Sequence, residues 1–335
     1  MKLLWLDLNS SYAHSSLALP ALHAQIADDT TIEWCTTINE NTGMVVNQIY
    51  HHQPDIIAAT NWLFNHEQLL HIVSRAKALL PHCCIVLGGP EFLGNNEAFL
   101  RKNKFVNGVF RGEGEEVFPI WLKVWNHPVN EWNQISGLCY LDESDQYQDN
   151  GIARVMNFSQ LVSPEKSRFF NWSKPFVQLE TTRGCFNTCA FCVSGGEKPV
   201  RTISLEAIRE RLNVIHQHGI KNVRVLDRTF NYNNKRAKEL LHLFREYAPD
   251  ICFHLEIHPA LLSEELKEEL AILPNGLLHL EAGIQSLREP VLEKSRRIGK
   301  LSDALQGLKY LCSLKNMETH ADLIAGLPLY HLSEI

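Results

Sequence analysis

The stretch Glu180-Thr-Thr-Arg-Gly-Cys-Phe-Asn-Thr-Cys-Ala-Phe-Cys192 places Cys185, Cys189 and Cys192 in one short segment. Three residues separate the first two cysteines and two separate the second pair, so a single loop can present three thiolates to a compact inorganic centre. Thiolate sets of this kind are the ligands of iron–sulfur clusters. A closed structural zinc site needs a fourth protein ligand, and no fourth cysteine follows nearby. The pattern predicts a four-iron cluster with one open iron, and a zinc loop is the alternative.

This cysteine spacing resembles the signature loop of the radical SAM superfamily. In that family, S-adenosylmethionine chelates the open iron, and one electron from the cluster cleaves it to a 5′-deoxyadenosyl radical. The resemblance implies that Phe191, just before the third cysteine, holds the adenine. It also implies an electron donor such as flavodoxin or ferredoxin.

Composition describes an ordinary globular chain of 335 residues, with 45% hydrophobic and 21% charged residues. This length suggests about two domains. A net charge of −6 argues against a broad nucleic-acid surface, and no apolar run approaches the roughly 20 residues that span a bilayer. The cysteines outside the loop lie in or beside apolar segments and are expected to be buried thiols. We expect a cytoplasmic protein without a membrane partner.

The first part of the chain alternates short runs rich in Val, Ile and Leu with helical stretches, which predicts a parallel sheet covered on both faces. Ligands of such sheets bind at the carboxyl ends of the strands. The turn containing Gly88 and Gly89 follows one such strand, and a second glycine-rich turn covers residues 111–116. Glycines let a backbone approach a flat ligand closely, but they also serve simple tight turns. The predicted strands are residues 2–8, 32–38, 55–62, 84–89 and 106–111.

These two turns resemble the N-terminal cobalamin-binding domain found in one branch of the radical SAM superfamily. The resemblance implies a Rossmann-like cobalamin-binding-type domain over residues 1–130, with Gly88 and Gly89 among its cofactor contacts. The Asp-x-His-x-x-Gly motif, whose histidine ligates cobalt, does not occur in the sequence, and His14 is expected to be a loop residue that forms hydrogen bonds. Residues 131–174 are predicted to form a hairpin and a linker.

The second part, residues 175–335, again alternates strands and helices. Strands are predicted at residues 176–181, 222–227, 251–257, 277–284 and 319–325. Five β/α units in series suggest an open parallel barrel, and the family fold has six. We therefore expect a partial (β/α) radical SAM barrel, truncated after about five units, in an α/β chain.

Polar residues occur near the carboxyl ends of these strands, where barrels carry their chemistry. The resemblance implies that Asp227, Glu256 and Gln285 contact S-adenosylmethionine, although a salt bridge at the barrel rim is the alternative for each. Gly195-Gly196-Glu197 looks like the family's Gly-Gly-Glu motif, but it follows the cysteine loop and not the second strand.

Taken together, these features predict a radical SAM enzyme with three cofactors: a 4Fe–4S cluster, S-adenosylmethionine and cobalamin. The leading prediction is methyl transfer to an unactivated carbon of a small-molecule or peptide substrate. Radical rearrangement or ring closure without methyl transfer is one alternative. A non-catalytic metal-binding remnant is the other.

Overall fold

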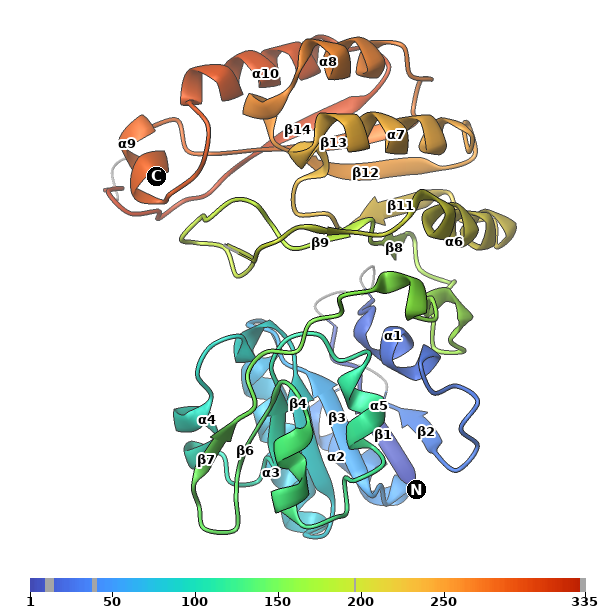
Figure 1. The fold of residues 1–335 in the computed structure, drawn as a ribbon, viewed down its shortest axis with the longest axis vertical. Coiled ribbons are helices and arrows are strands. Elements are labelled where there is room, and N and C mark those ends of the chain that lie inside the picture. Colours follow the sequence, from blue (N-terminus) through green and yellow to red (C-terminus); the bar gives the residue numbers. More distant parts are fainter. Residues whose placement is uncertain (10–14, 38–40, 196, 332–335) are drawn as a thin grey trace. The chain divides into compact units, whose positions relative to one another are not determined.

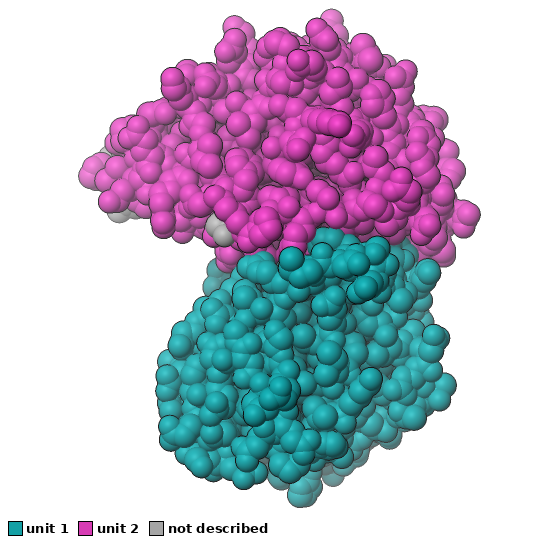
Figure 2. All heavy atoms as spheres, viewed as in Figure 1, with its two compact units in different colours: residues 1–171 teal, residues 172–335 magenta. Residues whose placement is uncertain are grey.

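The computed structural model describes residues 1–9, 15–37, 41–195 and 197–331. The chain divides into two compact units, Met1–Asn171 and Trp172–Ile335, which are coloured separately in Figure 2. The division lies close to the predicted start of the second domain at residue 175. No helix among the described residues combines the length and apolarity that a membrane crossing requires.

The first unit is built on one seven-stranded sheet of order β2-β1-β3-β4-β5-β6-β7. The first five strands are parallel, and the last two add antiparallel pairs. The α/β alternation predicted from the sequence is therefore confirmed, and each predicted strand is present with shorter bounds. The strands are β1 (Lys2–Leu6), β2 (Glu33–Thr36), β3 (Ile56–Thr60), β4 (Cys84–Gly88), β5 (Gly108–Phe110), β6 (Leu138–Leu141) and β7 (Tyr147–Asp149).

Helices cover both faces of this sheet because its central strands are apolar on both sides (Figure 1). One core joins the strands to α2 (Thr42–His52), α3 (His66–Leu79) and α4 (Glu97–Lys102). The opposite core joins them to α1 (Ala18–Ala24) and α5 (Val117–Trp121).

The β6–β7 hairpin differs from its predicted place in a segment between the domains. Strand β6 pairs with β5 from Gly108↔Tyr140 to Phe110↔Leu138, so the hairpin completes the sheet of the first unit. Trp132, Leu138 and Tyr140 are fully buried in one of the two cores. The sequence predicted a hairpin within residues 131–174, but nothing local in the sequence showed that this hairpin pairs with the preceding strand.

The second unit contains a five-stranded, all-parallel sheet of order β14-β13-β12-β11-β8. Five strands were predicted and five are present among the described residues. They are β8 (Val177–Leu179), β11 (Asn222–Val225), β12 (Cys252–Ile257), β13 (Leu278–Gln285) and β14 (Glu318–Leu323).

Strict alternation along β12 and β13 separates the two faces of this sheet. Alternate residues such as Phe253, Leu255 and Leu280 are buried with the apolar sides of the helices. The intervening positions are half-buried and give the sheet a second, mostly polar face, with His254, Glu256, His279, Glu281 and Gln285 on it. The helices are α6 (Leu205–Gln217), α7 (Asn234–Arg245), α8 (Glu264–Ala271), α9 (Glu289–Lys294) and α10 (Leu301–Ser313); neighbouring members α6, α7 and α8 contact one another in chain order (Figure 1).

Helix starts follow the expected capping chemistry. The side chain of Ser204 accepts a hydrogen bond from the backbone of Ala207 at the start of α6, and Ser263 accepts one from Leu266 at the start of α8. Both caps fix where the chain turns from a strand end into the helix that covers the sheet.

Candidate functional site: the cysteine loop and the strand ends around it

The cysteine loop leaves β9 (Thr182–Arg183) and returns into β10 (Arg201–Thr202), which pair antiparallel and close its base. The backbone N–H of Cys185 donates to the carbonyl of Glu197 at 2.9 Å and ties the two ends together. Cys185 and Cys189 are buried, Cys192 is exposed, and all three are free thiols. Cys312, which was expected to be buried, is exposed on α10.

Tight backbone turns curl the loop around its thiols. The N–H of Cys192 donates to the carbonyl of Cys189 at 3.2 Å, and that of Gly195 donates to Cys192 at 3.0 Å. A Cβ atom on Gly195 would lie 2.4 Å from the Cys189 carbonyl oxygen, so only glycine fits here. Three free thiols on so compact a loop suit an iron–sulfur cluster, whose ligands are cysteine thiolates. Of the predicted Gly-Gly-Glu motif, Gly196 lies outside the described residues.

Arg297 joins this loop to the sheet, and sequence reasoning missed it. One guanidinium nitrogen donates to the Cys189 sulfur at 3.9 Å, and another donates to the Gly283 carbonyl at 2.6 Å. The loop is further tied to this segment by the N–H of Ala190, which donates to the Ser295 carbonyl. Arg297 is 108 residues away from Cys189, and no local pattern marks it.

The two largest effects on the pKa of Cys189 are the burial of its thiol and the positive charge of Arg297. Burial raises the pKa of the Cys189 thiol, and the guanidinium of Arg297 acts in the opposite direction. Metal ligands must be thiolates, and a hydrogen-bond donor that faces the sulfur favours that form. The donor set and its neighbour both fit an iron–sulfur cluster.

Asp227, a predicted cofactor contact, lies at the carboxyl end of β11 with 1% of its surface exposed. Its carboxylate accepts hydrogen bonds from the backbone N–H groups of Thr181 and Thr182, at 2.8 and 2.9 Å, and from the Thr181 hydroxyl. Burial raises its pKa, and these hydrogen bonds oppose the rise. The carboxylate thus holds the chain where it enters the cysteine loop, and a cofactor contact for Asp227 stays a prediction.

Gln285 ends β13 with a φ of +68°, a left-handed conformation that is uncommon for residues other than glycine. The sheet register shifts here, between Gly283 and Gln285. A Cβ on Gly283 would lie 2.4 Å from the Gln285 amide nitrogen and 3.3 Å from an Arg297 nitrogen. The structure therefore brings the predicted Gln285 next to Arg297 and, through it, to the cysteine loop.

Glu256 lies on the polar face of the sheet, directly opposite Glu281 in the register of β12 and β13. Burial, followed by the nearby Glu281 carboxylate, raises the pKa of Glu256 to about 7, although Arg228 opposes the shift. A carboxyl with this pKa can hold or release a proton near neutral pH, which is typical of functional sites.

Two aromatic side chains complete the surroundings of the loop. Phe191, the predicted adenine contact, is half-buried between Cys189 and Cys192. His258, at the end of β12, is 3% exposed and its ring lies 6.4 Å from that of Phe186. Neither of its ring nitrogens makes a hydrogen bond of ordinary geometry with a described residue. Burial and the charge of Arg297 lower its pKa to about 4, so the ring is neutral.

In the first unit, Gly88 and Gly89 follow β4 as predicted. Gly89 has a φ of +109°, and a Cβ there would lie 2.6 Å from the Asn61 carbonyl oxygen. Glycine is therefore needed here because the ends of β3 and β4 approach each other closely. At Gly88 a Cβ would find ordinary contacts, nearest to Phe110 at 3.8 Å. The part played by these glycines toward a cofactor stays a prediction, and His14 lies outside the described residues.

The second glycine-rich turn, at residues 111–116, has a structural role in the first unit. Gly112 has a φ of +103° and forms a bridge with Ala153, whose carbonyl oxygen would lie 2.2 Å from an added Cβ. The backbone N–H of Val155 donates to the Glu113 carboxylate at 2.7 Å. The turn thus holds the segment that follows β7.

Comparison with known proteins adds to this geometry. Residues 179–335 match the family described as the radical SAM superfamily. An uncharacterized methyltransferase of Pyrococcus horikoshii is 26% identical over 292 residues, which cover 82% of this chain and 61% of that protein. Cytidylyl-2-hydroxyethylphosphonate methyltransferase of Streptomyces wedmorensis is 22% identical, over 82% of this chain and 58% of its own. The chain spans about three fifths of the length of these two relatives.

Solved structures show the same fold. The methyltransferase TsrM from Kitasatospora setae, with cobalamin and a 4Fe–4S cluster bound, superposes with a TM-score of 0.74 at 15% identity, over 97% of this chain and 69% of that one. The cobalamin-dependent radical enzyme OxsB with aqua-cobalamin bound gives 0.75 at 16% identity, over 96% and 49%. Residues 179–335 thus match the radical SAM superfamily, and over most of its length the chain has the fold of two solved structures that hold cobalamin.

Proposed function

We propose that this chain is the catalytic part of a cobalamin-dependent radical SAM methyltransferase that acts on an unactivated carbon. The observation that carries the proposal is the loop with Cys185, Cys189 and Cys192, three free thiols held in one tight turn system. When bound, the cluster with S-adenosylmethionine supplies a 5′-deoxyadenosyl radical, and cobalamin supplies the methyl group.

The chain's own residues position these groups. Cys185, Cys189 and Cys192 would hold the cluster through their thiolates, and S-adenosylmethionine would bind at the position without a cysteine. Arg297 fixes the Cys189 sulfur and the end of β13 relative to each other through its two hydrogen bonds. Gln285 lies beside Arg297 and is therefore well placed for a polar group of S-adenosylmethionine.

We assign Phe191 to the adenine, since it is half-buried within the same loop. Glu256 lies on the polar face of the sheet with a pKa of about 7. We propose that it contacts the ribose or the amino group as a neutral or ionised carboxyl.

Cobalamin is assigned to the first unit, as a Rossmann-like domain. Its five parallel strands have the order β2-β1-β3-β4-β5, a doubly wound arrangement that binds ligands outside the carboxyl ends of the strands. Gly88 and Gly89 lie at that edge, at the end of β4. Two solved structures with this fold hold cobalamin, which supports the assignment.

The test is anaerobic reconstitution of the protein with iron, sulfide and hydroxocobalamin, followed by gel filtration. We expect iron and cobalt to remain with the protein, and 5′-deoxyadenosine to form once S-adenosylmethionine and a reductant are added. Iron and 5′-deoxyadenosine without retained cobalt would contradict methyl transfer and favour radical rearrangement or cyclisation. A colourless, zinc-loaded protein without 5′-deoxyadenosine would contradict the enzyme and favour a metal-binding remnant.

We propose a small molecule or a peptide as the natural substrate. The proposed electron donor is a flavodoxin or a ferredoxin. A chemical reductant replaces the donor in the experiment above. The assay therefore tests the radical chemistry without either partner.

A further inference from the structure

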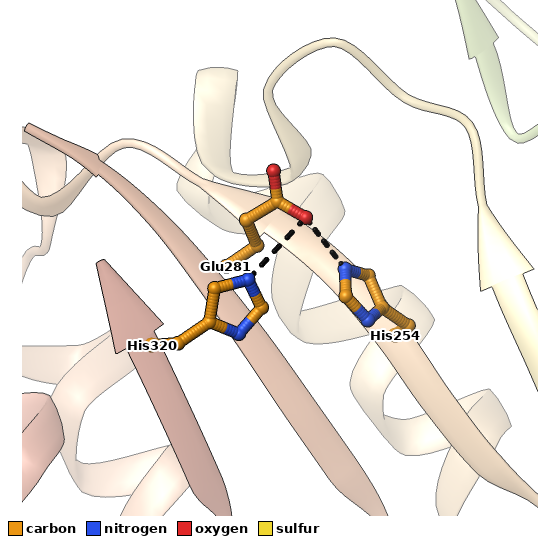
Figure 3. A group of neighbouring side chains, drawn as sticks. All are labelled: His254, Glu281 and His320. Carbon is orange, nitrogen blue, oxygen red and sulfur yellow. Dashed lines mark hydrogen bonds and ion pairs between the residues drawn. The ribbon is translucent and has the colours of Figure 1, made fainter. Parts of the chain in front are cut away.

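A second group of metal-ligating side chains lies on the polar face of the barrel sheet, away from the cysteine loop in the sequence. His254 comes from β12, Glu281 from β13 and His320 from β14, three neighbouring strands of the sheet. Their side chains point toward one another, with both imidazoles directed at the same carboxylate oxygen (Figure 3). The sheet register produces this meeting, because Glu281 is paired with His320 and lies two residues beyond the partner of His254.

The distances suit a shared ion. The Nε2 atom of His254 lies 2.9 Å from Oε2 of Glu281, and Nε2 of His320 lies 3.6 Å from the same oxygen. One ligand atom from each residue can be chosen so that all three lie within 4.8 Å of one another. Ligands about 2.0–2.1 Å from a tetrahedral zinc ion are separated by roughly 3.3 Å. The two histidine–carboxylate distances lie on either side of that value, and the ligand atoms of the two imidazoles lie within 4.8 Å of each other. Side-chain rotations that bring the imidazoles closer would place the three atoms around one ion.

We propose that His254, Glu281 and His320 bind a divalent transition-metal ion, for which Zn²⁺ is the best match. Two imidazoles and one carboxylate form the ligand set of open, catalytic-type zinc sites, and of other divalent transition-metal sites with free positions. Three protein ligands leave a fourth position on the polar face of the sheet for water or an oxygen donor. Its three ligands are different residues from the three cysteines of the loop, so metal binding here can be tested without radical chemistry.

A neighbouring histidine orients one of the ligands. Nε2 of His279 lies 2.8 Å from Nδ1 of His320, the ring nitrogen that does not face Glu281. When His320 donates its Nδ1 proton to His279, its Nε2 presents a lone pair toward Glu281. Metal-ligating histidines are commonly oriented through the second ring nitrogen in this way.

This face carries three carboxyl groups near the proposed ligands, and the guanidinium groups of Arg224 and Arg228 also act on it. Glu256 faces Glu281 across β12 and β13, and the Asp322 carboxyl forms a hydrogen bond with Glu281. Three carboxyl groups thus crowd one half-buried region, in which the side chains of His254 and Glu281 are 14% and 28% exposed. A divalent ion would offset the repulsion among them.

The experiment uses the full chain with Cys185, Cys189 and Cys192 all replaced by Ala, so that no thiolate site competes for metal. Titration with Co²⁺ should give visible d–d absorption at one ion per chain, without sulfur-to-cobalt charge transfer, and Zn²⁺ should displace the cobalt. His320→Ala and Glu281→Gln should abolish this absorption. His279→Ala should weaken binding by roughly 10- to 100-fold, as expected for a group that orients a ligand.

The matched control is His216→Ala, which removes another histidine–carboxylate pair, with Asp250 at 3.0 Å on the exposed surface. It should leave the titration unchanged. If the triple variant does not fold, the zinc content of the cluster-reconstituted wild-type protein is compared with that of its His320→Ala variant. The variant should contain one zinc ion per chain less than the wild type. Absence of cobalt binding by a folded triple variant, or equal zinc in the wild-type and His320→Ala proteins, overturns the proposal and leaves a hydrogen-bonded cluster.

Discussion

At the scale of single residues, Arg297 is the side chain on which the site depends most after the cysteines. It donates to the Cys189 sulfur and to the Gly283 carbonyl, so removing it frees both the loop and the strand end. We predict that Arg297→Gln lowers the retention of iron against a chelator by roughly 10- to 100-fold, the usual effect of a group that supports a metal ligand. Arg245→Gln, at an exposed position on α7, is the control. Equal retention in the two variants would show that Arg297 does not support the cluster.

The raised pKa of Glu256 should make the free energy of unfolding depend on pH. Burial and the nearby Glu281 carboxylate raise its pKa in the folded protein to about 7, above the usual 4.5 of a glutamate, so the folded state binds the extra proton between these pH values. Its contribution to stability is complete below about pH 4.5 and is lost as the pH rises to about 7, by about 3 kcal/mol at most. Glu256→Gln removes this dependence.

Urea denaturation at pH 5 and pH 8 measures the effect. The wild-type protein should lose more free energy of unfolding over this range than Glu256→Gln does, whereas the exposed Glu264→Gln should behave as the wild type. An identical loss in all three proteins would mean that the carboxyl of Glu256 is not perturbed.

At the scale of elements, the packing of α10 against the turn Pro259–Leu261 gives a prediction whose sign depends on two opposing effects. Replacing a helical glycine by alanine gains about 1 kcal/mol of helix propensity. At Gly307, however, the new Cβ would lie 2.0 Å from the Pro259 carbonyl oxygen, and overpacking of this kind costs about 1–3 kcal/mol or more.

A 2.0 Å contact with backbone lies at the costly end of this range, so Gly307→Ala should destabilise the protein by about 2 kcal/mol, as measured by the urea midpoint. Its exposed neighbour gives the control, since Gln306→Ala should change stability by less than about 0.5 kcal/mol. A more stable Gly307→Ala protein would contradict the close packing of α10 on this turn.

Elements were also the scale at which the sequence was most informative. The strands predicted at residues 251–257 and 277–284 agree with β12 and β13 to within one residue at each end. The serine caps of α6 and α8 were equally local signals. Within the site, the three cysteines could be found because they are close in sequence.

The remaining contacts depend on pairing between distant segments and left no such signal. Arg297 meets Cys189 only through the fold. The group of His254, Glu281 and His320 exists only once three strands adopt their register. Asp227 accepts hydrogen bonds from Thr181 and Thr182. The sequence showed only that Asp227 follows a predicted strand, so these hydrogen bonds could not be predicted.

At the scale of the whole molecule, the first unit should fold on its own as residues 1–171. A fragment that ends at residue 130 would lose Trp132, Ile135, Leu138, Tyr140 and Ala153 from one core. At about 1.5–3 kcal/mol for each large apolar side chain, this loss is comparable to the roughly 5–15 kcal/mol that stabilises a typical domain. We predict a cooperative unfolding transition for 1–171 and none for 1–130, by circular dichroism in urea. Cooperative unfolding of the shorter fragment would show that the hairpin is dispensable.

The central claim is that Cys185, Cys189 and Cys192 hold a cluster with an iron open to S-adenosylmethionine. Electron paramagnetic resonance of the anaerobically reconstituted, reduced protein tests it most directly, with iron counted on the same sample. We predict about four irons per chain and a cluster signal that changes when S-adenosylmethionine is added. Both should be lost in Cys189→Ala and kept in Cys312→Ala, which alters an exposed thiol on α10. A full cluster in Cys189→Ala, or a wild-type signal that S-adenosylmethionine leaves unchanged, would contradict the account.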